Sequence, residues 1–309
     1  AARMSFVSWQ YLFLLFGVVV LYWRLPVRAR IGLLWGASYF FYGFWDARFL
    51  ALIFTTTTVD FFCALGVSGR RFSPLRVFVT SLLPALWLAL GTQFEFSSGK
   101  AAWSTAGAAL VFPALFPWLY AAAFRLPEAG RRRWMLGLSI GINLAVLGCF
   151  KYFGFFADSL VDLLGLAGIN PGWTLPTILL PVGISFYTFQ SISYTVEVCR
   201  GNATPTERFP TFATYLSFFP QLVAGPIERP HTLLPQFLER RTWLAEDLQR
   251  GLRLILVGWF KKVFVGDNCA LLANHAFDPA TELNAGWAIL GVVAFAFQIY
   301  GDFSGYTDI

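Results

Sequence analysis

Charged residues are scarce in this sequence. Only 13% of its 309 residues are Asp, Glu, Lys or Arg, while 57% are hydrophobic and the mean hydropathy is +0.61. A water-soluble protein carries roughly twice that share of charged residues, about 25%, so a soluble fold would leave many apolar runs exposed. The composition therefore predicts an all-α, polytopic membrane protein that lies in the lipid bilayer.

Cysteine and histidine are also few. The four cysteines lie far apart, without CxxC or Cys/His spacing, which argues against a disulfide framework or a zinc site. The sequence contains no GxSxG, Walker loop or HExxH. We therefore expect no bound metal or cofactor. The cysteines are Cys63, Cys149, Cys199 and Cys269.

Positive charge is present, but it falls in short clusters between apolar runs. A net charge of +6 distributed in this way follows the positive-inside rule and does not indicate a nucleic-acid partner. With nine spans, the clusters place the N-terminus outside and the stretch 210–237 on the cytoplasmic side. The expected spans are Phe6–Trp23, Ile31–Phe44, Phe49–Gly66, Leu75–Leu90, Ala106–Phe124, Trp134–Phe156, Leu175–Val198, Leu252–Ala273 and Trp287–Phe303. No internal repeat or long loop divides the chain, so we expect one transmembrane domain over 1–309.

The stretch Pro210–Phe237 is apolar but unsuited to span a membrane. Its uninterrupted apolar part is shorter than the roughly 20 residues of a membrane helix, and Pro220 and Gly225-Pro226 would break a helix inside it. Irregular backbone at membrane depth survives only against protein or beside a water-filled cavity. We therefore expect a re-entrant segment that lines a cavity. An ordinary interfacial loop is the alternative.

Polar side chains within the apolar runs form two further candidate surfaces. The helix after Pro181 carries a stripe of polar residues on one face, which predicts either a cavity wall or hydrogen bonds to another helix. The last residues, Tyr300–Ile309, place polar groups after an apolar helix, and Gly301 and Gly305 allow a bend or a close helix contact. The stripe consists of Tyr187, Gln190, Ser191, Tyr194 and Glu197.

The run from Arg250 to Ala273 carries cationic side chains. Arg250, Arg253 and Lys261 share one helical face, so we expect this part to lie along the cytoplasmic interface, with its lysines reaching toward lipid headgroups or phosphate.

Only two histidines are available as a general base. His231 lies in the stretch 210–237, and His275 lies in an expected outer loop. Neither has an orienting partner that the sequence can reveal. On chemistry alone, either could serve as that base.

Several blocks resemble the membrane-bound O-acyltransferase family, in particular its alginate O-acetyltransferase-like branch. They are NLAVLGCFKYFGFF from Asn143, LPVGISFYTFQSISYTVEVCRG from Leu180, SFFPQLVAGPIERPHTLLPQF from Ser217 and FQIYGDFSGYTDI from Phe297. An earlier block, SYFFYGFWDARFLALIFTTTTVDFF, fits the same branch, so the similarity covers nearly the whole chain.

The resemblance implies a ring of tilted helices around a funnel in the bacterial inner membrane. An acyl thioester, acetyl-CoA or an acyl carrier, would donate acetyl groups for O-acetylation of an exported polysaccharide such as alginate, often through a periplasmic acetyltransferase partner. The family's catalytic His lies in a later motif that this sequence lacks, so the expected base lies beyond Ile309. We accordingly expect the N-terminal part of an enzyme, inactive by itself.

Two other functions stay open: D-alanyl transfer to teichoic acid, and a non-catalytic membrane scaffold or conduit. For the acyltransferase, the residues expected in the substrate tunnel are Tyr187, Gln190, Gln221, Pro226, Arg229, Asp302 and Tyr306.

Overall fold

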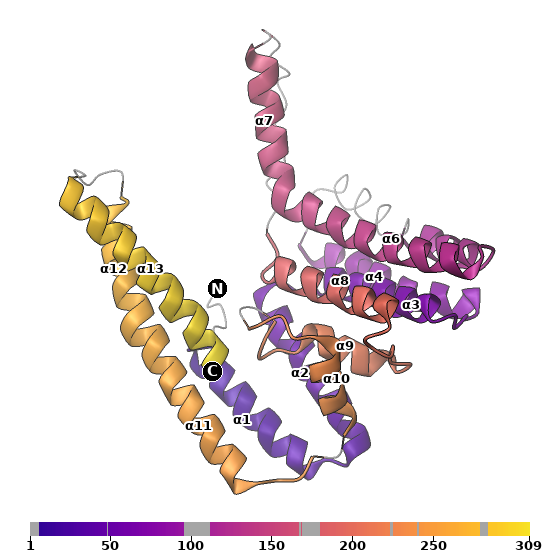
Figure 1. The fold of residues 1–309 in the computed structure, drawn as a ribbon, viewed down its shortest axis with the longest axis horizontal. Helices are drawn as coiled ribbons and strands as arrows, with labels where there is room; N and C mark the ends of the chain where they lie inside the picture. Colours follow the sequence, from indigo (N-terminus) through magenta and orange to yellow (C-terminus); the bar gives the residue numbers. More distant parts are fainter. Residues whose placement is uncertain are drawn as a thin grey trace. The chain divides into compact units, whose positions relative to one another are not determined.

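Every element of the described chain is helical (Figure 1). The computed structural model describes residues 6–47, 49–95, 112–166, 168, 180–222, 225–239, 241–278 and 284–309. Parts of two expected spans, 106–111 and 175–179, lie outside these ranges. The predicted all-α class is confirmed.

Three described helices are long and apolar enough to cross a membrane. They are α3 (Phe49–Val67), the continuous helix Glu128–Leu166 and α13 (Ala285–Asp308). Three shorter apolar helices are α1 (Trp9–Arg24), the first part of α4 (Pro74–Glu95) and the helix Phe112–Ala123. The second expected span is longer than predicted, because α2 extends over Val27–Asp46.

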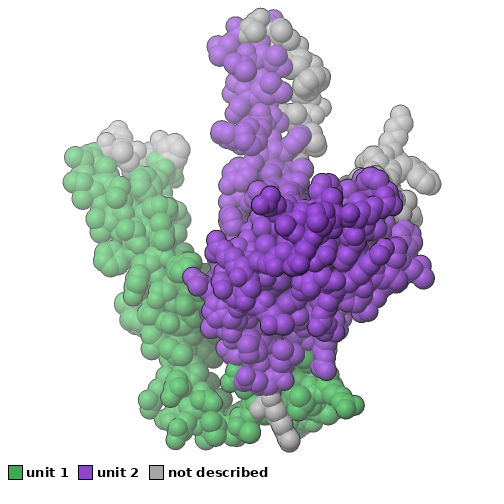
Figure 2. All heavy atoms as spheres, turned by 45° about the vertical axis from the view of Figure 1, so that its right-hand side comes forward, with its two compact units in different colours: residues 1–33, 219–226, 240–309 green, residues 34–218, 227–239 purple. Residues whose placement is uncertain are grey.

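The chain forms two compact units, which are drawn in different colours in Figure 2. Unit 1 contains residues 1–33, 219–226 and 240–309, and unit 2 contains residues 34–218 and 227–239. Each unit combines distant parts of the sequence. The expectation of one transmembrane domain over 1–309 stays a prediction.

Helix α3 forms the centre of unit 2. It packs against α4, α6 (Glu128–Leu147), α8 (Ile184–Arg200) and α9 (Phe209–Ser217). Its sequence is apolar on every side, which is typical of a buried helix. Most of its side chains from Thr56 to Val67 are accordingly inaccessible. Its threonine hydroxyls donate to backbone carbonyls of the preceding turn. The Thr57 hydroxyl, for example, donates to the Ile53 carbonyl at 2.6 Å.

A π-helical segment, η1 (Gly148–Tyr152), interrupts the long helix of unit 2. It joins α6 to α7 (Phe153–Leu166), and the two helices run in different directions (Figure 1). A π-bulge within an α-helix is a known cause of helix bending. The span expected over 134–156 therefore contains a bend that its apolar pattern does not reveal.

Unit 1 contains a helical hairpin at its C-terminal side. α11 (Ala245–Trp259), the π-helix η2 (Phe260–Gly266) and α12 (Asp267–Ala276) follow one another, and α13 packs back along all three (Figure 1). Asn284 caps α13 by accepting from the Trp287 N–H at 2.9 Å.

Candidate functional site

A carboxylate lies in the centre of unit 2. Asp60 of α3 is fully buried and accepts hydrogen bonds from Ser139 and Asn143 of α6 and from Ser191 of α8. The Asn143 Nδ2 atom lies 2.8 Å from the Asp60 Oδ2 atom. Ser139 also contacts the Thr195 hydroxyl of α8 at 3.1 Å. One acidic side chain therefore joins three helices.

Asp60 is not among the site residues expected from the sequence. A lone acid inside the apolar run 49–66 was the available signal, since ionisable groups in such runs are costly and face the bundle interior. Its partners lie 79 to 131 residues later in the sequence. A single sequence contains no pattern that pairs them.

The polar stripe of α8 contacts neighbouring helices. Ser191 reaches Asp60, and the Gln190 amide donates to the Tyr215 carbonyl of α9 at 2.8 Å. Tyr187 is buried with its ring edge-on to Tyr42 of α2, the centroids 6.4 Å apart. Ser191 and Gln190 thus form hydrogen bonds to other helices, whereas Tyr187 makes a ring contact. The assignment of Tyr187 and Gln190 to a tunnel wall stays a prediction.

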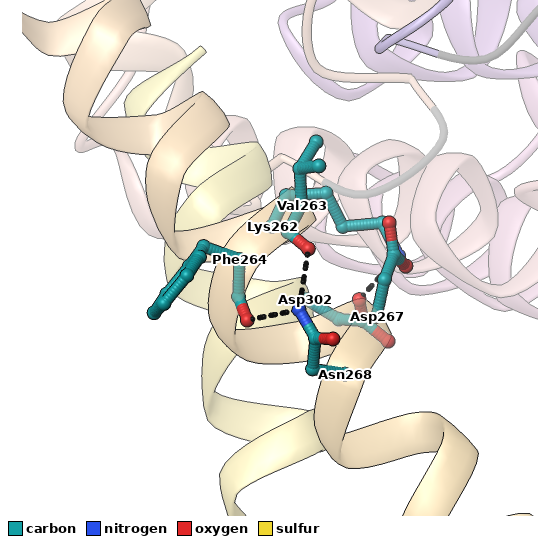
Figure 3. A network of polar contacts seen from close by, with 6 residues as sticks. All are labelled: Lys262, Val263, Phe264, Asp267, Asn268 and Asp302. Atoms are coloured by element: carbon teal, nitrogen blue, oxygen red, sulfur yellow. Dashed lines mark hydrogen bonds and ion pairs between the residues drawn. The ribbon is translucent and has the colours of Figure 1, made fainter.

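A second polar cluster lies in unit 1, between η2 and α13 (Figure 3). The Lys262 ammonium is 2.6 Å from the Asp267 carboxylate and 2.7 Å from that of Asp302. It also lies 5.6 Å from the centre of the Tyr306 ring, which favours a cation–π contact. Lys262 thus joins the predicted site residues Asp302 and Tyr306, which stand one turn apart on α13.

Lys261 contacts Ser304 and Asp308, which lie one turn apart on α13. Its ammonium lies 2.9 Å from the Ser304 hydroxyl and 2.5 Å from the Asp308 carboxylate. Both lysine side chains thus bond to α13, and their contact with headgroups stays a prediction.

Glycines allow this close approach. A Cβ atom on Gly305 would lie 2.9 Å from the Gly258 carbonyl oxygen, and one on Gly301 would lie 2.7 Å from the Gly266 nitrogen. The close helix contact predicted for Gly301 and Gly305 is confirmed. Pairs of small residues four apart bring membrane helices together in the same manner.

Inside unit 1, a chain of aromatic contacts connects this cluster with Phe219 of the stretch 210–237. The Tyr306 ring contacts Phe6 at 5.3 Å, Phe6 contacts Tyr11 at 4.9 Å, and Tyr11 contacts Phe219 at 5.9 Å between centroids. The beginning, middle and end of the sequence therefore meet in one unit. Periodicity within any single helix cannot predict this meeting.

The stretch 210–237 is broken as predicted. It forms α9, then non-helical residues over 218–222 and 225–229, then α10 (Pro230–Leu238). Gln221 is partly buried in unit 1, and the Gly225 N–H donates to its carbonyl at 3.0 Å. Pro226 is exposed in unit 1, and Arg229 is exposed beside α10 in unit 2. Whether these residues line a tunnel stays a prediction.

The two histidines belong to different units, His231 to unit 2 and His275 to unit 1. His231 is exposed in the first turn of α10. His275 belongs to α12, which corrects the loop expected there, and its ring lies 5.0 Å from that of Trp287. Within the described ranges, no three His, Cys, Asp or Glu side chains are placed to share a metal ion.

The chain is similar to several proteins that are named as acyltransferases. It is 37% identical to the probable alginate O-acetylase AlgI of Pseudomonas putida over 79% of this chain and 47% of that protein. It is 34% identical to its Azotobacter vinelandii counterpart over 99% and 50%. The peptidoglycan O-acetyltransferase of Helicobacter pylori is 31% identical over 85% and 53%.

A more distant match is the teichoic acid D-alanyltransferase of Bacillus subtilis, which is 23% identical over 41% of this chain and 32% of that protein. No protein-family profile matches the sequence, and no solved structure matches it. The chain spans about half the length of the curated relatives it matches. The extent of these similarities agrees with the resemblance seen in the sequence, and the chain belongs to the membrane-bound O-acyltransferase family.

Proposed function

We propose that the full-length protein carrying this chain is a membrane O-acyltransferase that acetylates an exported polysaccharide such as alginate. The main support is the similarity to relatives named O-acetylases, which extends over 99% of the chain in one case. The lone buried carboxylate of α3 and the ionic cluster of α13 add support, because intramembrane polar groups of this kind mark functional interiors.

The proposed reaction is acetyl transfer from a thioester to an alcohol. The hydroxyl oxygen attacks the thioester carbonyl, an ester C–O bond forms, and the C–S bond breaks to release a thiol that receives the hydroxyl proton. A general base would assist by holding that proton. Acetyl-CoA or an acyl carrier would be the donor, as a substrate and not as a resident cofactor.

In this proposal the present chain supplies walls and supports around the reacting groups. The tunnel wall would include Asp302 and Tyr306, which Lys262 holds on one side of α13. The protein would cross the bacterial inner membrane several times. A periplasmic acetyltransferase partner would pass the acetyl group to the polymer.

The test uses a polymer-producing host that lacks its own O-acetylase. Expression of the full-length gene product should restore polymer acetyl groups, measured by proton NMR. Asp302→Asn should lower the acetyl content, whereas Thr307→Val, which changes an exposed position on the same helix, should not. An unacetylated polymer despite normal membrane levels of the protein would refute the proposal.

D-alanyl transfer is the second candidate, supported by the distant similarity to the Bacillus subtilis enzyme. The same NMR spectra distinguish the two, because ester-linked alanine and acetate give different methyl signals. A conduit without catalytic activity would transfer neither group, even when donor and acceptor are supplied to purified membranes.

A further inference from the structure

The break in the stretch 210–237 leaves backbone carbonyls without helical partners. Helix α9 ends at Ser217 because Phe218 adopts a non-helical conformation with φ −54° and ψ 108°. The last four carbonyls of a helix have no partner within it. The next helix begins at Pro230, which has no N–H to offer. In a membrane protein such carbonyls need donors from elsewhere.

Tyr215 connects the two ends of this break. Its carbonyl, near the end of α9, accepts from the Gln190 amide of α8 at 2.8 Å. Its hydroxyl donates to the Glu228 carbonyl at 2.9 Å, on the far side of the break. Tyr215 and Gln190 are both buried, with 0% and 4% of their surface exposed. A single residue therefore fixes both ends, and α8 holds that residue in place.

The tyrosine ring is itself confined. Its centroid lies 6.0 Å from the Tyr194 ring and 6.2 Å from the Phe212 ring. Packing on these rings limits the directions in which the hydroxyl can point. The exposed residues Ile227 and Arg229 flank Glu228, so their backbone position depends on the bond that Glu228 accepts.

We infer that Tyr215, supported by Gln190, is a positioning residue that sets the spacing between the two ends of the broken segment and thereby the placement of Arg229. Tyr215 acts through the backbone of Glu228 and does not contact substrate. The inference rests on the proposed function where it concerns acetyl transfer, and its geometric part can be measured separately.

Tyr215→Phe removes the hydroxyl and keeps the packed ring. The matched control is Tyr194→Phe, because Tyr194 is equally buried and its hydroxyl accepts from the Thr206 N–H at 3.1 Å, outside the broken segment. A second variant, Gln190→Met, removes the donor to the Tyr215 carbonyl and leaves the Tyr215 hydroxyl in place.

The geometric test measures accessibility of Ile227. Ile227→Cys is introduced into the full-length protein, with the native cysteines replaced by alanine, and its labelling by a maleimide is followed. Loss of one buried hydrogen bond should speed labelling about fivefold in Tyr215→Phe. Gln190→Met should also speed the labelling. Tyr194→Phe should label at the rate of the unsubstituted protein.

The functional test measures acetyl transfer at saturating donor. Tyr215→Phe should lower the rate about fivefold at unchanged membrane level and melting midpoint, while Tyr194→Phe retains the rate. The inference is overturned if Tyr215→Phe labels and transfers like the unsubstituted protein, or if both tyrosine variants change alike. If the unsubstituted protein transfers no acetyl, the proposed function fails, and the labelling still decides whether Tyr215 positions the segment.

Discussion

The Asp60 carboxylate accepts its hydrogen bonds from neutral side chains. In the described chain its carboxylate receives hydrogen bonds from two hydroxyls and one amide, and no cationic side chain bonds to it. A buried polar group is tolerated only when its hydrogen bonds are made. The network therefore stabilises the packing of α3, α6 and α8 as long as every member is present.

Replacing Asp60 with Ala should destabilise unit 2 strongly. The substitution removes the acceptor of the Ser191 hydroxyl, and a buried donor left without an acceptor costs about 1–3 kcal/mol. Ser139 and Asn143 also lose their bonds to Asp60, although they keep the Thr195 hydroxyl and the Ser139 carbonyl as second acceptors. The melting midpoint of the detergent-purified protein, followed by intrinsic fluorescence, should fall well below that of Asp60→Asn, which keeps one acceptor.

The control for this comparison is Ser159→Ala. It removes an exposed α7 hydroxyl that donates to the Phe155 carbonyl, and it should leave the midpoint unchanged. Equal midpoints for Asp60→Ala and the unsubstituted protein would show that the network contributes little.

Lys262 offers a second comparison between single residues. Its side chain is 13% exposed, and its partners Asp302 and Asp267 are 33% and 52% exposed. The less exposed pair is screened less by solvent, so Lys262 should couple more strongly to Asp302 than to Asp267.

Two double-mutant cycles test this order. Lys262→Met combined with Asp302→Asn should give a coupling of about 1 kcal/mol in unfolding free energy, and combination with Asp267→Asn about half of that or less. Chemical unfolding in detergent provides the measurement. A larger coupling to Asp267 would contradict the assigned geometry.

The two π-helical segments show how an element can differ from its sequence pattern. η1 coincides with a bend, and η2 carries the two consecutive lysines that contact α13. Both segments lie inside longer helical runs. Steric fit at the glycines then holds η2 and α11 against α13, because each glycine pair leaves no room for a side chain.

Gly305→Val should separate α13 from α11 and η2. The new side chain would overlap the Gly258 carbonyl and the Lys262 side chain, and overpacking of this kind costs about 1–3 kcal/mol. The melting midpoint should fall. Gly251→Val is the matched control, since a Cβ atom there meets nothing within 4 Å. A similar fall in both variants would point to helix propensity as the cause.

The sequence predicts which segments form the main helices better than it predicts which residues those helices contact. α3 and α13 match their expected spans closely, because continuous apolar runs determine helix length in a membrane. The break between α9 and α10 follows from proline and glycine. The Asp60 network and the Lys262–Asp302 pair were beyond prediction, because each depends on contacts at least 40 residues apart in the sequence.

At the scale of the whole molecule, several arginines of unit 2 lie near the ends of its helices. Arg131 of α6 donates to the Gly66 carbonyl near the end of α3 at 3.1 Å, and Arg132 donates to the Cys199 carbonyl near the end of α8. Arg70 pairs with Glu207 in the same neighbourhood. Cations at helix C-termini interact favourably with the free carbonyls, and clustered arginines at one end favour the cytoplasmic side of a membrane.

Orientation can be tested with single cysteines in a variant that lacks the native ones. Arg125→Cys stands at an exposed position in the arginine-rich region, and Asn274→Cys at an exposed position near a loop without Lys or Arg. A membrane-impermeant maleimide applied to intact spheroplasts should label Asn274→Cys and leave Arg125→Cys unlabelled until the membrane is permeabilised. Asn274→Cys should label first because the clustered positive charge opposes transfer of the arginine-rich loop across the membrane. Labelling of Arg125→Cys before permeabilisation would reverse the orientation, and would place the broken segment 210–237 on the outer side.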